Sequence, residues 1–221
     1  MLKNIRSMLC FITPCAILVI LSGCTGPSTS SHSSPNSGRQ VVQMWADYPR
    51  FDSIDALVDG SDSVIAVRYV SAHSEMIYPD LSNSADPLTN PQAGVKVSKS
   101  DKERMGVPST VSVVQVTSSL KGSHKPGDFV RITQLGGVID NVDYVENDTM
   151  LLENVDHNQS LLLFVSEHNG NGADLVNPED GVMAIAGDTL TAARDTRGHK
   201  GRALAGNLGS VKAAIHGVHG C

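Results

Sequence analysis

The stretch TVSVVQVTSSLKGSHKPGD, residues 110–128, carries the clearest fold signal in the chain. Its valine-rich first half predicts a β-strand over 110–117, and the glycines and proline of 121–128 predict a turn. Residues 129–135 then alternate as the partner strand. The valines change phase in the middle of the first strand, which is typical of a β-bulge or of a strand buried on both faces. The stretch therefore predicts a hairpin like those at the corners of small barrels.

Further short strands surround this hairpin in the sequence. Each is a short apolar run bounded by Gly, Pro, Asn or Asp. They are expected over residues 63–71, 161–165, 174–177, 182–186 and 189–192. Five to seven strands at this spacing favour a mainly β fold, either a small antiparallel barrel or a sandwich.

Two helices are expected at the ends of this β domain. Asp52 or Ser53 can cap a short helix that runs through Leu57, and Gly60 ends it. Near the C-terminus, apolar residues spaced by four and three form one amphipathic stripe, although two glycines weaken its first turn. The stripe consists of Leu204, Leu208, Val211, Ile215 and Val218.

Composition limits the classes of partner. The 221 residues include 23 acidic and 17 basic side chains, for a net charge of −6. Surfaces that bind nucleic acid need clustered Lys and Arg against the phosphates, so this balance argues against a nucleic-acid partner. Beyond the N-terminus the chain has no uncharged apolar run of about 18 residues, which argues against a polytopic membrane protein.

Residues 1–23 have the layout of a lipoprotein signal peptide. Lys3 and Arg6 precede a mostly apolar stretch, 7–21, and small residues follow it. The sequence at its end resembles a bacterial lipobox, formed by Leu21, Ser22, Gly23 and Cys24. In a lipobox a signal peptidase cuts before the cysteine, and the thiol carries diacylglycerol. We therefore expect a mature chain that is lipid-anchored through Cys24 at the extracytoplasmic face of the cell membrane; a plain secretory signal or an uncleaved anchor is the alternative.

The segments that follow divide the mature chain. Residues 24–40 comprise the lipidated cysteine and a Ser-, Pro- and Gly-rich tether that cannot bury enough surface to order itself. The β domain is expected over 41–195, with a long surface loop at 79–108, and a helix with a His- and Gly-rich tail over 196–221. Because Cys10 and Cys15 leave with the signal, Cys221 has no internal disulfide partner.

Three aromatic residues open the β domain. Trp45, Tyr48 and Phe51 lie within seven positions of one another. Aromatic side chains bury the largest apolar surface, so packing against the core is the expectation. The alternative is a surface on which a sugar ring stacks.

A resemblance supports the barrel interpretation. It is carried by ALVDGSDSVIAVRYV at 56–70, by the V-x-V-T-x-x-L-K-G-x-x-K-P-G-D pattern at 114–128, by Gly136-Gly137 and by LLLFV at 161–165. This order of features resembles exported bacterial proteins with an OB-like fold, and its hairpin is similar to netrin-like and metalloproteinase-inhibitor-like barrels. The resemblance implies a small OB-like barrel and assigns no catalytic residue.

Motifs for chemistry are sparse. The chain has no Gly-x-Ser-x-Gly, His-Glu-x-x-His, P-loop or Cys-x-x-Cys motif, which disfavours an enzyme but leaves open a hydrolase with a dispersed site.

Imidazole and thiolate bind zinc or copper, so a terminal cluster is a candidate metal site, made of His216, His219 and Cys221. An acidic loop is expected to be solvated, and calcium bound by its hard oxygen ligands is the alternative; its residues are Asp140, Asp143, Glu146 and Asp148. A basic run is expected to be a solvated linker, and a contact with anionic headgroups or wall polymers is the alternative; it consists of Arg194, Arg197, Lys200 and Arg202.

These patterns together favour one function and leave two others open. The expected function is that of a membrane-anchored cell-surface lipoprotein whose barrel binds or scaffolds an unknown surface protein or polymer, without a cofactor other than the acyl lipid on Cys24. A metal- or solute-binding lipoprotein that uses the terminal histidines is one alternative. A surface hydrolase is the other.

Overall fold

The structure, a computed structural model, describes residues 38–79, 81, 88, 93–146, 149–168, 172–196, 201–202, 204 and 206–218. Strands dominate this part of the chain. They are β1 (Gln40–Met44), β2 (Ser63–Ile77), β3 (Val107–Lys121), β4 (Phe129–Leu135), β5 (Gly137–Ile139), β6 (Val142–Glu146), β7 (Ser160–His168), β8 (Gly172–Leu175), β9 (Val182–Ala186) and β10 (Thr189–Ala192). The helices are α1 (Ile54–Asp59), α2 (Lys99–Arg104), the short 3-10 helix η1 (Leu152–Asn154) and α3 (Leu208–Val218).

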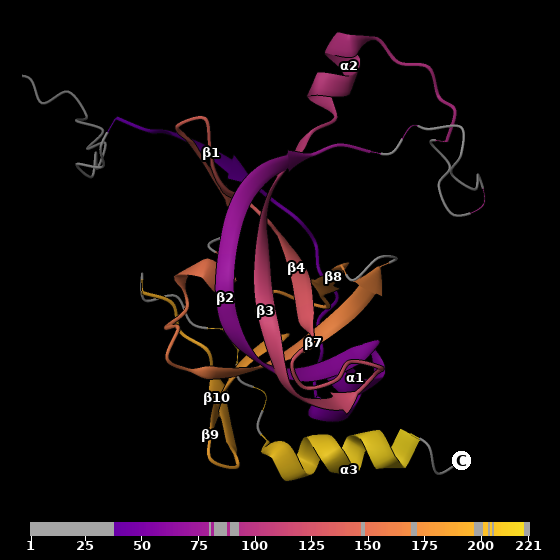
Figure 1. The fold of residues 1–221 in the computed structure, drawn as a ribbon, viewed down its shortest axis with the longest axis vertical. Coiled ribbons are helices and arrows are strands. Elements are labelled where there is room, and N and C mark those ends of the chain that lie inside the picture. Colours follow the sequence, from indigo (N-terminus) through magenta and orange to yellow (C-terminus); the bar gives the residue numbers. More distant parts are fainter. Residues whose placement is uncertain are drawn as a thin grey trace, which may run out of the picture. The chain divides into compact units, whose positions relative to one another are not determined.

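Five of the strands close into a barrel, in the order β2-β3-β4-β8-β7 and back to β2 (Figure 1). In chain order these are the first, second, third, fifth and fourth strands, which is the arrangement of an OB-like barrel. The expected mainly β fold with a helix near each end is confirmed. Neighbouring strands are antiparallel except β4 and β8, which run parallel. A closed ring with an odd number of strands must contain such a pair, so the barrel cannot be antiparallel throughout.

The change of valine phase in β3 coincides with a bulge. Tyr69 pairs with Val114 and Ser71 pairs with Val113, so Val70 of β2 is the extra residue between them. Two further register shifts lie nearer the start of β2. Bulges increase strand twist, and here they let the long ribbon of β2 and β3 curve around the barrel (Figure 1).

Strand β7 separates two hydrophobic clusters. Leu161, Leu163 and Val165 point into the barrel, whereas Leu162 and Phe164 face the opposite side. All five are buried. One edge of β7 pairs with β2, and the other edge pairs first with β9 and then with β8. The apolar run at 161–165 therefore forms the buried central strand that its composition predicted.

Helices α1 and α3 cover the outer cluster. Ser53 caps α1 by accepting a hydrogen bond from the Ala56 N–H at 3.1 Å, as expected, and Gly60 ends the helix. Before α3, Asn207 and Ser210 cap each other: Asn207 Oδ1 accepts from the Ser210 N–H and Ser210 Oγ accepts from the Asn207 N–H, both at 2.8 Å. This pair places the start of α3 at Leu208, so Leu204, the first residue of the expected stripe, lies before the helix.

A second, smaller sheet was not expected. Its order is β1-β6-β5, and β1 runs parallel to β6. The β5–β6 hairpin turns through Asp140 and Asn141, which have φ angles of 47° and 65°, a conformation that Asp and Asn tolerate better than most residues. Strand β1 begins at Gln40, so the end of the expected tether belongs to this sheet.

The long loop predicted over 79–108 contains a helix where the structure describes it. Strand β2 continues to Ile77 and β3 starts at Val107, so the ribbon extends beyond the barrel, and α2 lies at its far end, away from α3 (Figure 1). Ser98 caps α2 through a hydrogen bond from the Asp101 N–H at 3.1 Å.

Truncation of a side chain on the outer face of β7 tests how much this strand contributes to the stability of the domain. Phe164→Ala leaves a cavity in the cluster beneath α1 and α3, and we expect a loss of about 3–5 kcal/mol in the free energy of unfolding. Urea denaturation followed by circular dichroism measures this loss. Phe129→Ala is the matched control, because this side chain is 56% exposed and its truncation should cost less than about 1 kcal/mol. Equal losses for the two variants would contradict the central role of β7.

Candidate functional site

A cavity with a volume of about 410 Å³ lies against the outer face of β4, β7 and β8. Most of its surface is apolar, with a few hydroxyl, imidazole and carboxylate groups. Its lining comprises Tyr48, Thr133, Gln134, Leu135, Thr149, Ser166, His168, Asp174, Leu175, Val176 and Pro178. Cavities of this size and composition are typical of sites for small ligands.

A network of buried and partly buried polar groups holds the segment that carries Tyr48. Asn177 Nδ2 donates to the Pro49 carbonyl at 2.9 Å. The side chain of Asp180 is 1% exposed and accepts two hydrogen bonds from Arg202. Arg202 Nε donates to Asp180 Oδ1 at 2.7 Å, and Arg202 Nη2 donates to Asp180 Oδ2 at 2.8 Å. The Phe51 N–H donates a longer hydrogen bond to Asp180 Oδ2. Arg202 donates in addition to the Phe51 carbonyl. Bidentate pairing of this kind fixes geometry as well as charge, so Tyr48 is held over the barrel wall.

This network corrects the expectation for the basic run. Arg202 is not a solvated linker residue, because its guanidinium joins a buried carboxylate to the first segment of the domain. The bonds with Asp180 raise the pKa of Arg202, so it stays charged. Arg197 and Lys200 lie outside the described residues.

A second cavity of about 180 Å³ adjoins the first. Tyr48, Thr149 and Pro178 line both cavities, so the two cavities are neighbours that share part of their walls. The other residues of the smaller cavity are mostly polar: Ala46, Asp47, Arg50, Glu146, Asn177 and Glu179. We call these two neighbouring cavities together the Tyr48 cleft.

Burial and two carboxylates act on the hydroxyl of Tyr48. Its pKa is raised to about 12, first by burial and then by the negative charges of Glu146 and Asp174. The hydroxyl therefore remains protonated at neutral pH and can both donate and accept a hydrogen bond in the cleft.

Ser166, His168 and Asp174 all line the larger cavity, but they do not form a nucleophile–base relay. His168 Nε2 lies 2.7 Å from Asp174 Oδ2, whereas Ser166 Oγ donates to Asp62 Oδ2 at 3.1 Å. A serine nucleophile needs a hydrogen bond to its base, and here each group is bonded to a different carboxylate. The described hydrogen bonds therefore do not join Ser166 to His168.

The predicted metal and lipid residues are mostly beyond the described part of the chain. His216 is an exposed residue of α3, and His219 and Cys221 lie outside the described residues, as do Leu21, Ser22, Gly23 and Cys24. Within the described ranges, the structure brings together no three His, Cys, Asp or Glu side chains that suit a metal ion. No helix in those ranges is long and apolar enough to span a bilayer.

The acidic loop proposed for calcium is the β5–β6 hairpin. Asp140 is exposed in its turn, Glu146 is buried at the end of β6, and Asp148 lies outside the described residues. Asp143 and Glu146 are three positions apart on a strand, which places them on opposite faces. The described carboxylates of this loop are therefore not gathered around one point.

The three aromatic residues of the first segment have separate roles. Phe51 packs against the outer cluster, as expected, and Tyr48 is half-buried in the cleft. Trp45 is 75% exposed, so its predicted packing against the core is wrong.

The sequence signals for the cleft were weak: Glu146 stood in a candidate calcium loop, and His168 belonged to a predicted turn.

Comparisons with known proteins add no assignment. No family model matches this chain, and no curated protein sequence is significantly similar to it.

The raised pKa of Tyr48 predicts that its hydroxyl loses its proton at a higher pH than an ordinary tyrosine does. Between pH 10 and 12 the folded chain keeps a proton on Tyr48 that the unfolded chain loses, so the free energy of unfolding should fall as the pH rises through this range. Absorbance at 295 nm of the wild type minus that of Tyr48→Phe isolates this step, with circular dichroism to verify folding. A difference spectrum that titrates near pH 10 would contradict the burial of the hydroxyl.

Proposed function

We propose that this protein is an exported bacterial lipoprotein whose OB-like domain binds a small ligand in the Tyr48 cleft. One observation carries the proposal: a cavity of about 410 Å³, mostly apolar and edged by a few polar groups, lies on the outer face of the barrel. Most ligand sites are preformed concavities of about 300–1,000 Å³ with this mixture of surfaces.

The position of the cleft also supports binding. OB-like barrels bind their ligands on an outer face and through neighbouring loops, and this cleft lies on the outer face of β4, beside the β7–β8 hairpin. That parallel is a likeness of fold and assigns no ligand. The described lining of the larger cavity contains neither Lys nor Arg, which argues against a phosphate-rich ligand.

The lipid anchor would decide where the cleft works. Acylated Cys24 would attach the domain to the extracytoplasmic face of the cell membrane, and the tether would extend from there to β1. A ligand carried by a surface protein or polymer could then be held near the membrane.

The cleft can be tested without knowing its natural ligand. We expect neutral sugars, amino acids or short peptides from a fragment library to shift the backbone amide NMR signals of the cleft residues. Thr133→Phe should fill the cavity and abolish these shifts, since Thr133 lines it on β4. Trp45 is the sole tryptophan in the chain and lies three residues from Tyr48, so its fluorescence gives a second reading.

Thr191→Phe is the matched control, because Thr191 is an exposed residue of β10 that does not line the cleft. It should leave fragment binding unchanged. A library in which no fragment binds at the cleft, or in which Thr133→Phe has no effect on binding, would count against the proposed function.

The anchor makes a separate prediction. In a bacterial host, Cys24→Ala should abolish acylation and move the protein from the membrane fraction to the soluble fraction. Mass spectrometry of the N-terminal peptide and cell fractionation measure the two effects. Cys221→Ala should change neither, and a wild-type chain with an unmodified Cys24 thiol would contradict the anchor.

A further inference from the structure

A buried carboxylate in the Tyr48 cleft has one oxygen that receives no hydrogen bond from the described residues. Glu146, the last residue of β6, is only 3% exposed. Its Oε2 accepts a hydrogen bond from the Thr149 hydroxyl, but its Oε1 is buried without a hydrogen-bond donor among the described residues. Burial of an ionised carboxylate costs free energy unless a donor or a positive charge compensates it.

The surroundings of Glu146 add negative charge. The smaller cavity, which Glu146 lines, also presents Asp47 and Glu179, and Arg50 is the one basic residue in its described lining. In the larger cavity, Asp174 is paired with His168. Acidic groups thus outnumber basic ones in both the cleft and the chain as a whole.

Two carboxylates lie close enough to Tyr48 to act on its hydroxyl. Burial is the largest cause of the raised pKa of Tyr48, and the negative charges of Glu146 and Asp174 add to it. The same two charges attract a cation, and this attraction offsets the cost of burying the cation. The aromatic ring of Tyr48 is a further group that attracts cations.

We propose that the Tyr48 cleft binds an alkylammonium group, with its alkyl chain in the larger cavity and its ammonium beside Glu146 in the smaller one. This inference rests on the proposed function and names the chemistry of its ligand. The mostly apolar wall of the 410 Å³ cavity suits the alkyl chain, and the polar, acidic lining of the 180 Å³ cavity suits the charge. A lysine side chain and a free amine share this chemistry.

Two probes of equal size separate charge from shape. n-Pentylammonium and 1-pentanol are titrated into the purified chain, and Trp45 fluorescence and amide NMR shifts are followed. We expect saturable binding of pentylammonium at the cleft and binding of pentanol that is at least about tenfold weaker, the difference that a charged hydrogen bond provides. Nα-acetyl-lysine methylamide then distinguishes the sources: binding as tight as that of pentylammonium indicates a peptide lysine, and weaker binding indicates a free amine.

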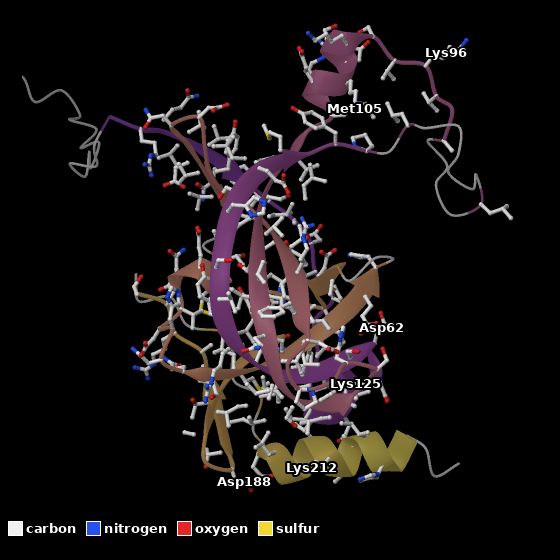
Figure 2. The ribbon with its side chains drawn as sticks, in the orientation of Figure 1. Asp62, Lys96, Met105, Lys125, Asp188 and Lys212 are labelled. Carbon is white, nitrogen blue, oxygen red and sulfur yellow. The ribbon has the colours of Figure 1, made fainter. Side chains whose placement is uncertain are left out.

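Glu146→Gln removes the charge and keeps the shape of the side chain. It should weaken pentylammonium binding at least about tenfold and leave pentanol binding unchanged. Glu103→Gln on α2 is the matched control, because α2 spans Lys99–Arg104 at the far end of the ribbon, where Figure 2 shows Lys96 and Met105. If Glu146→Gln does not fold, Asp174→Asn provides a second test, since its side chain is about half exposed and it should weaken binding in the same direction.

The possible outcomes separate this inference from the proposed function. Pentanol binding as tight as that of pentylammonium, or an unchanged affinity in folded Glu146→Gln, would overturn the ammonium site. If neutral fragments occupy the cleft but pentylammonium does not, this inference fails and the proposed function stands. If neither fragments nor pentylammonium bind, both fail.

Discussion

The burial of β7 on both faces is the constraint on which the rest of the structure depends. Its five central side chains divide between the barrel interior and the cluster under α1 and α3. Each fully buried side chain of this size contributes about 1.5–3 kcal/mol relative to an exposed one. Because the backbone groups of β7 are also buried, they must pair, and they pair with β2 on one edge and with β9 and β8 on the other.

The cleft follows from this arrangement. Where β7 leaves β9 and meets β8, its outward positions change from the apolar Leu162 and Phe164 to the polar Ser166 and His168. The helices cover the apolar half, while the polar half stays open beside β8. The segment around Tyr48, which the Asp180–Arg202 pair and Asn177 hold in place, encloses that open part. The same strand therefore supplies the core at one end and the wall of the cleft at the other.

Electrostatics give the cleft its proposed selectivity. A buried, incompletely bonded carboxylate on β6 and a half-exposed one on β8 come from different sheets, and both act on one tyrosine hydroxyl. Buried charge that is not fully compensated reduces stability, and such groups often mark functional sites. Here the cost would be offset when a cation enters, which makes ligand binding and domain stability interdependent.

Some of the cleft residues could be recognised from the sequence, but their grouping could not. Asp174 was expected in a strand and lies in β8, whereas His168 was expected in a turn and is the last residue of β7. Tyr48 and Glu146 are almost one hundred residues apart, and they meet because the β1–β6 sheet joins their segments. The parallel pairing of β1 with β6 leaves no local signal, since β1 is short and mostly exposed. The exposed Trp45 shows the same limit, because hydrophobicity alone does not tell which aromatic residue of a cluster is buried.

Local patterns in the amino-acid sequence determined the strands of the barrel, their turns, the bulge in the β2–β3 ribbon and the caps of α1, because each depends on residues within a few positions of one another. The closure of the ring was decided only by tertiary structure, since five strands require one parallel pair and no local pattern specifies where it lies. Tertiary structure also brought Tyr48, Glu146 and Asp174 together, because a cleft depends on which distant strands meet, and pairing across long sequence separations is chosen by the packing of the whole domain.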